Sequence, residues 1–438
     1  MRVVVVGAGA IGCLLGGLLA AGGHQVVLVG RPWRLEAVAR GGLVLDPPPW
    51  AAPQRHRSGT APGEKARDRS GAAPIPTRPG GEGDGGGGTS HGSGTARREP
   101  DDQRPLPVAV VASVGEATAG PAPDAVLVTV KMPALDAALA QVAAAWPGAD
   151  RGPSPLVITF QNGIGAEERA VARLGAGRVI AGTVTLSAAL EGHRVRIFNA
   201  GRGGIGLAPV TGTGPASTAG EADGGPRRFH PAGRAGDAPS RTAALAFRGL
   251  ASQWQATLAV PVVTAPDAAT LKWSKLLLNL VGNAVGALLQ WGVDRVFQDP
   301  VAAAVEHRSL REAVAVAGRV APALVDLPGY PVRLFARLTR WLPTPVFRRA
   351  VGPQAAGGRG GKLPSVALDV AAGRHPTEIQ ALHGAVARAA ETLALEAPVC
   401  ATLARLVDEA AADPARRAWF RDRPDRLLAA LRDAGAWG

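Results

Sequence analysis

The chain opens with the stretch RVVVVGAGAIGCLLGGLLAAG, residues 2–22, in which an apolar run leads into closely spaced glycines and then into a second apolar run. The first run suits a buried strand of a parallel sheet, and the second suits a helix. Between them lies the pattern GxGxxG, whose glycines allow a tight turn and a close approach of the backbone to a pyrophosphate at the helix N-terminus. The stretch therefore predicts a dinucleotide-binding turn. Its candidate cofactor contacts are Gly7, Ala8, Gly9, Ala10, Ile11 and Gly12.

Length and composition narrow the class of protein. At 438 residues and 46% hydrophobic content, the chain is long enough for two domains, each with its own core. Cys13 and Cys400 lie far apart and give neither a disulfide framework nor a metal-ligand spacing, so we expect a reducing cytoplasm and no metal site. A secretory leader is the alternative interpretation of residues 3–21, but the glycines there suit a turn and a helix contact better. Elsewhere no run of about 18 residues lacks charges and helix breakers, so no membrane span is expected.

The formal net charge of +13 is unevenly distributed. Residues 331–362 contain many cations and no Asp or Glu, and the arginines alternate with apolar residues at roughly helical spacing. We expect a basic insertion at about 322–362 that forms a surface helix pair, with contact to a membrane surface or an acidic partner as the alternative. No motif of a nucleic-acid-binding module accompanies these charges, so nucleic acid is not an expected partner. The cations are Arg333, Arg337, Arg340, Arg348, Arg349, Arg359 and Lys362.

Two segments are rich in glycine and proline and poor in apolar side chains, residues 47–105 and 211–241. Such stretches cannot bury enough surface to offset the entropy of ordering them, so we predict disordered insertions. Strand and helix patterns continue on both sides of each segment. Both are therefore expected to be surface loops inside one domain, because lengthening a closed loop costs free energy only slowly.

With those segments set aside, strands and helices alternate through the first part of the chain, which indicates a doubly wound parallel sheet. The expected strands are RVVVVG, QVVLVG, VAVVAS, DAVLVTVK, PLVITFQNG, VIAGTV and VRIFNA. Long helical runs then follow at 267–290, 299–321, 377–396 and 398–412. The predicted fold class is α/β, with an N-terminal Rossmann-type domain over 1–264 and an all-α C-terminal domain over 265–438.

The first helical run carries three polar residues in an otherwise apolar sequence, Lys275, Asn279 and Asn283. Their spacing of four places them on one face of a continuous helix, in a stripe about 12 Å long. Buried without partners, an ammonium and two carboxamides would be costly, so something polar must face them. Because the chain begins with a nucleotide-binding turn, we interpret that polar group as a carbonyl substrate.

Basic residues refine this interpretation. The only lysines are Lys65, Lys131, Lys272, Lys275 and Lys362, and a chain so biased toward arginine keeps lysine mainly where a tunable proton donor is needed. Lys275 is the candidate donor, and Lys131 follows a strand at the sheet edge where cofactors bind. Arg31 ends the second strand, where it suits the 2′-phosphate of NADP better than the ribose hydroxyls of NAD. The alternatives are a snorkelling lysine and an ordinary surface arginine.

Together these features resemble the ketopantoate reductase (2-dehydropantoate 2-reductase) family. The resemblance covers both ends of the chain and rests on GAGAIG, Lys131, FQNGIG with Asn162, KLLLNLVGN and SVALDVAAGRHPTEI. It implies a Rossmann domain followed by a helical domain, with NADPH reducing a ketone in the cleft between them.

The resemblance also implies roles for individual residues. Lys275 would protonate the keto oxygen, Asn279 and Asn283 would bind polar groups of the substrate, and Ser365 would hold its carboxylate. Glu378 would accept the substrate hydroxyl and tune Lys275. The cofactor would contact Arg31, Lys131 and Asn162. The alternative for Glu378 is a solvated helix start after Thr377.

The chain departs from the family pattern in several places. The spacing from Asp369 to Glu378 is one residue longer than usual, and His383 precedes Gly384 where the family has asparagine. Ala134 replaces a glutamine, and an asparagine is missing from LLQWGVDR. These departures lie near substrate and cofactor, so they bear on the choice of substrate more than on the type of reaction.

Three functions therefore remain open. The first is NADPH-dependent reduction of 2-dehydropantoate, the second is reduction of another small 2-keto acid on the same fold, and the third is a non-catalytic NADP-binding regulatory or scaffold protein. Intact Lys275 and Glu378 favour an enzyme. The expected partner is a small 2-keto acid, and assembly into a homodimer is left open.

Overall fold

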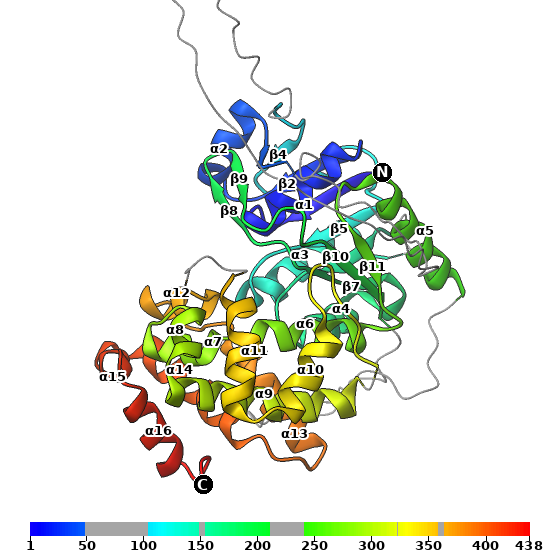
Figure 1. Ribbon diagram of the computed structural model, residues 1–438. Helices are drawn as coiled ribbons and strands as arrows, with labels where there is room; N and C mark the ends of the chain where they lie inside the picture. Colours follow the sequence, from blue (N-terminus) through cyan, green and yellow to red (C-terminus); the bar gives the residue numbers. More distant parts are fainter. Residues whose placement is uncertain (49–103, 149–153, 211–240, 322, 358–362) are drawn as a thin grey trace, which may run out of the picture.

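The computed structural model describes residues 1–48, 104–148, 154–210, 241–321, 323–357 and 363–438. They form a sheet-containing N-terminal domain and a helical C-terminal domain, which are stacked on each other in Figure 1. The predicted insertions at 47–105 and 211–241 lie almost entirely outside the described residues. Among the described residues, no helix is both long enough and apolar enough to cross a bilayer.

The main sheet of the described residues has the strand order β11-β10-β7-β6-β5-β1-β2-β4. The strands from β7 to β4 run parallel, as the alternation of strands and helices predicted. β10 is antiparallel to β7, and β11 is parallel to β10, so one edge of the sheet runs in the opposite direction. The bounds are β1 (Arg2–Val6), β2 (Gln25–Val29), β4 (Ala109–Val111), β5 (Ala125–Val128), β6 (Leu156–Thr159), β7 (Val179–Val184), β10 (Ile205–Pro209) and β11 (Val262–Thr264).

One expected strand belongs elsewhere. The VRIFNA segment forms β9 (Arg194–Ile197), which pairs with β8 (Ala188–Glu191) and β3 (Val44–Asp46) in a separate small sheet, so its assignment to the main sheet was wrong. Val195 and Ile197 are buried, whereas Arg196 between them is exposed. This one-sided alternation suits a sheet with one face toward solvent, whereas a strand of the central parallel sheet is buried on both faces.

Each face of the main sheet is covered by its own hydrophobic core, and the alternating valines of β1 contribute to both cores. Val3 and Val5 pack with Leu14 of α1 and Trp254 of α5. Val4 and Val6 point to the other face, since successive side chains of a strand alternate, and belong to the core that continues into the helical domain. The helices of the first domain are α1 (Ala10–Ala21), α2 (Pro32–Gly41), α3 (Leu135–Ala145), α4 (Ala166–Leu174) and α5 (Arg241–Thr257).

The helical domain is joined to the sheet by α6, which packs against β7 and β10 and lies directly below them in Figure 1. Its helices are α6 (Ala268–Leu280), α7 (Asn283–Leu289), α8 (Val293–Gln298), α9 (Pro300–Val320), α10 (Val332–Trp341), α11 (Thr344–Gly357), α12 (Ser365–Ala371), α13 (His383–Thr392), α14 (Pro398–Ala412), α15 (Pro414–Phe420) and α16 (Pro424–Asp433). The predicted runs 299–321 and 398–412 correspond to α9 and α14. The run predicted over 377–396 begins with a short 3-10 turn, η6 (Ile379–Ala381), before α13.

The predicted run 267–290 is two helices and not one, because the chain breaks between Leu280 and Asn283. Gly282 has a φ of 71°, in the left-handed region that favours glycine, and its amide donates to the buried carboxylate of Glu306 at 2.7 Å. A Cβ at Gly282 would meet Val293 Cγ2 at 2.6 Å, so the site also lacks room for a side chain. The expectation of one continuous polar stripe was therefore wrong. Lys275 and Asn279 share α6, and Asn283 begins α7.

The basic segment forms the two expected helices, α10 and α11, and their apolar faces belong to the core. Val332 and Phe347 are fully buried, and the Phe347 ring stacks on His307 of α9 with a centroid distance of 4.0 Å. The two nitrogens of His307 contact Thr344 Oγ1 at 3.0 Å and the Thr339 carbonyl at 2.9 Å, which ties both helices to α9. Among the described residues of the segment, none of the arginines is buried.

Candidate active site

The glycine turn between β1 and α1 has the geometry of a phosphate-binding turn. Gly7 has a φ of 111°, and a Cβ there would lie 2.7 Å from the Val130 amide nitrogen. A Cβ at Gly12 would lie 2.1 Å from the Gly7 carbonyl oxygen, so this glycine lets α1 pack closely on the strand. A Cβ at Gly9 would meet nothing within 4 Å, which leaves open space at the N-terminal end of α1. These residues therefore fit a pyrophosphate, which the helix N-terminus would stabilise.

Arg31 follows β2 and is the N-cap residue of α2. It is exposed, and its guanidinium carbon lies 5.0 Å from the centroid of the Trp33 ring, where a cation is attracted by the ring face. Arg34 lies on the same ring at 5.3 Å, a second cation that the sequence analysis did not single out. The end of β2 thus presents two guanidinium groups, which suit a phosphate group.

Lys131 joins the two domains. It lies at the N-terminus of η3 (Met132–Ala134), just after β5, and its Nζ is 3.0 and 2.9 Å from the two carboxylate oxygens of Asp369 on α12. Asp369 also accepts a hydrogen bond of 2.8 Å from Arg374 Nε. The carboxylate is nearly buried, at 5% exposure, so this ion pair is partly shielded from water.

Glu378 lies in the same region, and its carboxyl is buried. Burial raises the pKa of Glu378 above its usual range, the positive charge of Lys131 lowers it, and the negative charge of Asp369 raises it. A hydrogen bond from the Asn162 side chain also lowers this pKa. Glu378 was expected to tune Lys275, and that pairing stays a prediction. The influence of Lys131 on Glu378 was not anticipated.

Asn162 and Asn279 come from different domains and meet side chain to side chain. Asn279 Nδ2 on α6 donates to Asn162 Oδ1 on the FQNGIG loop at 3.1 Å. Because Asn162 also bonds Glu378, three of the predicted site residues form one hydrogen-bonded chain across the domain junction. Lys275 is half-buried one helical turn before Asn279, so it lies on the same face of α6.

Asn283 and Ser365 also lie together. Asn283 Nδ2 donates to the Asn279 carbonyl, which the break after α6 leaves without its helical partner. Asn283 Oδ1 accepts from Ser365 Oγ at 3.4 Å and from the Val366 amide at 3.3 Å. Asn283 thus fixes the start of α12 against the break between α6 and α7, and its predicted contact with substrate remains a prediction.

His383, which replaces a family asparagine, is fully buried at the start of α13. Burial lowers the pKa of His383 to about 3, so the ring is neutral. Neither ring nitrogen has a hydrogen-bond partner among the described residues.

Lys272 was counted in the sequence without a role being assigned to it. Its Nζ lies 3.0 Å from Glu167 Oε1 and donates to the Gln161 carbonyl at 2.7 Å, and both charged side chains are buried. Thr159 Oγ1 donates to the same carboxylate at 2.6 Å. This buried network ties α6 to the loop that carries Asn162. The signal in the sequence was an acidic residue shortly after FQNGIG and a lysine one turn before Lys275. Within the described part of the chain, no group of three or more His, Cys, Asp or Glu residues is placed to hold a metal ion.

Comparison with known proteins gives a consistent result. Residues 3–68 and 91–211 match the family model described as ketopantoate reductase PanE/ApbA, and residues 267–411 match its C-terminal model. A 46-residue segment is 48% identical to a 2-dehydropantoate 2-reductase of Pyrococcus horikoshii, over 10% of this chain and 15% of that protein.

Solved structures extend the comparison over nearly the whole fold. A PanE/ApbA family ketopantoate reductase from Ralstonia eutropha JMP134 has a TM-score of 0.58, with 22% identity over 94% of this chain and 98% of that one. A 2-dehydropantoate 2-reductase from Geobacter metallireducens GS-15 gives 0.59 with 22% identity, over 94% and 100%. D-mandelate dehydrogenase, solved with NADH and anilino(oxo)acetate, gives 0.59 at 16% identity over 94% and 98%. At these identities the likeness concerns the fold.

Proposed function

Because the chain belongs to the ketopantoate reductase family, we propose that it catalyses the NADPH-dependent reduction of 2-dehydropantoate (ketopantoate) to pantoate, in the cytoplasm, for pantothenate and coenzyme A synthesis. The observation that carries the proposal is the hydrogen-bonded chain from Glu378 through Asn162 to Asn279. These hydrogen bonds bring together the loop that carries Asn162, helix α6 with Lys275, and the segment after α12 that carries Glu378.

The bound nicotinamide would supply a hydride to the keto carbon, and the protein must then supply a proton to the keto oxygen. Lys275 is the proposed donor, since an ammonium can release a proton near neutral pH and a guanidinium cannot. Its position one turn before Asn279 places it on the face that meets Asn162. Asn279 would bind a polar group of the substrate and hold it against this face.

Glu378 is proposed to accept a hydrogen bond from the substrate hydroxyl. This role requires the carboxylate form, because a protonated acid would offer one acceptor fewer. Burial raises the pKa of Glu378, while Lys131 and Asn162 act in the opposite direction. Lys131 and Asn162 therefore favour the carboxylate form, whereas burial and Asp369 favour the protonated acid. Ser365, held beside Asn283, is proposed to bind the substrate carboxylate.

NADPH is preferred over NADH in this proposal because two guanidinium groups, those of Arg31 and Arg34, stand on the Trp33 ring after β2. A 2′-phosphate would be bound bidentately there, whereas a 2′-hydroxyl would leave both charges without an anion. The glycine turn and Lys131 would contact the rest of the cofactor.

A second substrate class is kept, because the solved structures of similar fold include a D-mandelate dehydrogenase. The corresponding keto acid carries an aromatic ring where ketopantoate carries a branched hydroxylated chain. His383 and the absent asparagine of LLQWGVDR are departures that would favour such a change of pocket.

The test is a steady-state assay of NADPH oxidation with ketopantoate and, separately, with benzoylformate. Ketopantoate should give the higher kcat/KM, and Lys275→Ala should abolish most of the turnover while retaining NADPH binding by fluorescence titration. Arg319→Ala, an exposed change at the end of α9, serves as the control and should leave activity unchanged. Preference for benzoylformate would move the proposal to the second class, and NADPH binding without turnover of either acid would remove the enzyme function altogether.

A further inference from the structure

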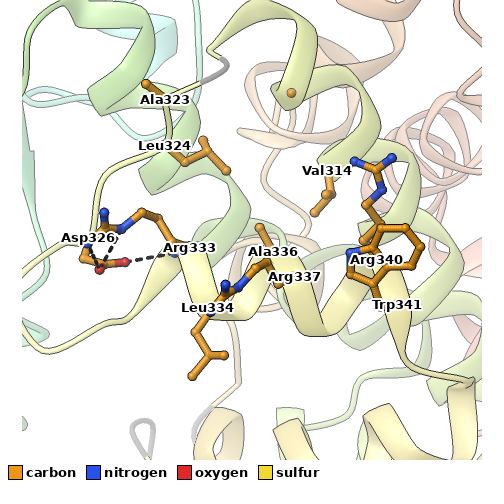
Figure 2. A pocket seen from close by; sticks show the side chains of 11 residues that line it. Val314, Ala323, Leu324, Asp326, Arg333, Leu334, Ala336, Arg337, Arg340 and Trp341 are labelled. Atoms are coloured by element: carbon orange, nitrogen blue, oxygen red, sulfur yellow. Dashed lines mark hydrogen bonds and ion pairs between the residues drawn. The ribbon is translucent and has the colours of Figure 1, made fainter.

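A groove with a cavity volume of about 660 Å³ lies between α9 and α10 and shares no residue with the candidate active site. Its apolar floor is lined by Val314 of α9, by Leu324 and by Ala336 of α10, which are labelled in Figure 2. Its rim carries Arg337, Arg340 and Trp341 from the last turns of α10. The volume lies in the range of small-molecule sites, which run from about 300 to 1,000 Å³.

The sequence of α10 produces this arrangement. In VRLFARLTRW, Val332, Ala336 and Thr339 are buried against the domain. Arg333, Arg337 and Arg340 follow one another at spacings of four and three and therefore share a second face of the helix. Arg337 and Arg340 are about one turn apart on that face.

The charge of the groove is unbalanced. Arg333 is neutralised by Asp326, whose Oδ2 accepts from Nε at 3.0 Å and from Nη2 at 2.8 Å. In contrast, no carboxylate of the described residues lies within ion-pair distance of Arg337 or Arg340. The acid in the lining, Asp326, is thus already paired with Arg333, which leaves Arg337 and Arg340 to face an anionic ligand.

Trp341 adds an apolar surface beside these charges. Its side chain is 72% exposed, the Arg340 guanidinium lies 5.0 Å from its ring centroid, and Leu334 on the adjacent face is 44% exposed. Contiguous exposed apolar surface rimmed by polar groups marks interaction sites and ligand-binding grooves. The chemistry that matches is an anionic group attached to an apolar body.

The wall of the groove also touches the helix of Lys275. Between the lining residues Leu324 and Asp326, the Val325 amide donates to Ser274 Oγ at 2.9 Å. Ser274 is fully buried on α6 and immediately precedes Lys275. A ligand that orders this wall would therefore act on the position of α6.

We propose that the groove between α9 and α10 is an effector site for a small amphipathic anion, with Arg337 and Arg340 holding the anionic group and the floor holding the apolar body. A membrane surface fits less well, because the two arginines border a concave groove whose helix is packed into the domain. That the ligand alters turnover rests on the proposed function, whereas its binding does not.

Binding is tested by isothermal titration calorimetry of the full chain, saturated with NADPH so that the cofactor site is filled. Octanoate should bind, and Arg337→Gln/Arg340→Gln should weaken it about tenfold or more, because both charge-assisted contacts are lost. The matched control Arg319→Gln/Arg349→Gln removes the same charge from exposed positions outside the groove and should bind as the wild type does. Octanol and inorganic phosphate should each bind at least tenfold more weakly than octanoate.

Several outcomes would overturn the site. They are absence of octanoate binding, equal loss in the control variant, phosphate binding as tightly as octanoate, flotation with phosphatidylglycerol vesicles that depends on Arg337 and Arg340, or a dimer in sedimentation that the groove variant dissociates. The effector role has its own test. Saturating octanoate should change the KM for the keto acid in the wild type and leave the groove variant unaffected, and an unchanged wild-type KM despite measured binding would refute that role alone.

Discussion

Lys131 of the sheet domain and Asp369 of the helical domain form a two-oxygen ion pair, with Nζ 3.0 and 2.9 Å from the carboxylate oxygens. The two residues are joined across the domain junction, and both influence the pKa of Glu378 in opposite directions. Substitution of Lys131 or Asp369 is therefore expected to shift the pKa of Glu378, and the sign of each shift follows from the charge that is removed.

Asp369→Asn is predicted to shift the acid limb of the kcat/KM profile to lower pH. The negative charge of Asp369 raises the pKa of Glu378, and its removal also leaves the charge of Lys131 uncompensated, so both effects lower that pKa. If the carboxylate of Glu378 is the active form, activity should persist to lower pH. Asp425→Asn, at an exposed ion pair with Arg423, is the control. A limb that stays in place, or moves upward, would contradict the assignment.

Lys275→Ala is predicted to lower kcat by about 10²- to 10⁴-fold, the usual contribution of a positioned proton donor. Lys275→Arg should be nearly as inactive, because guanidinium holds its proton too tightly. The Kd for NADPH should change little in either variant, which fluorescence titration can check. Recovery of wild-type turnover in Lys275→Arg would show that only a positive charge is needed there.

Lys272→Met is predicted to cost about 3 to 5 kcal/mol of the free energy of unfolding, because it leaves the buried Glu167 carboxylate without its cation. Lys272→Met/Glu167→Leu should recover part of that loss, since both charges are then gone. Urea unfolding followed by circular dichroism gives the values. If the double variant were less stable by the sum of the two single effects, Lys272 and Glu167 would not be energetically coupled.

Arg31→Ala is predicted to raise the KM for NADPH about tenfold while leaving the KM for NADH within about twofold, because only NADPH carries the 2′-phosphate. Arg40→Ala, on the same helix α2 and paired with Glu36, is the control. Equal changes in the KM for NADPH and for NADH would show that Arg31 does not bind the 2′-phosphate.

Glu168→Gln is predicted to increase stability relative to the wild type at pH 8 more than at pH 5. Burial, aided by the charge of Glu167, raises the pKa of Glu168 to about 7. Because the folded state then binds the proton more tightly than the unfolded state, the free energy of unfolding decreases as the pH rises toward about 7. Glutamine does not titrate, so the variant does not undergo this decrease. The difference should be on the order of 1 to 3 kcal/mol by thermal unfolding at the two pH values. A pH-independent difference would contradict the raised pKa.

The sequence predicted the α/β class and the helical second domain because local patterns specify them. The apolar run of β1 and the glycines at 7 and 12 determine the first βα unit by themselves. The reversed edge formed by β10 and β11 was missed, since IGLAP and VVT are short and their direction depends on pairing with distant strands.

The resemblance to the family named Asn162, Asn279 and Glu378 as site residues, and their roles remain predictions. The structure places these three side chains in one hydrogen-bonded chain, which the sequence did not predict. The pairing of Lys131 with Asp369 and of Lys272 with Glu167 depends on how two domains dock, which helical spacing does not encode. The break at Gly282 was missed because the run around it is apolar on both sides, and its cause is a carboxylate on α9, Glu306.

That break separates two side chains that a continuous helix would move together. Because α6 ends before Gly282, Lys275 belongs to one helix and Asn283 to the next, and the Glu306 carboxylate holds the segment between them. Substitutions within α7 are therefore expected to displace Asn283 and the start of α12, which Asn283 contacts, while Lys275 keeps its position on α6.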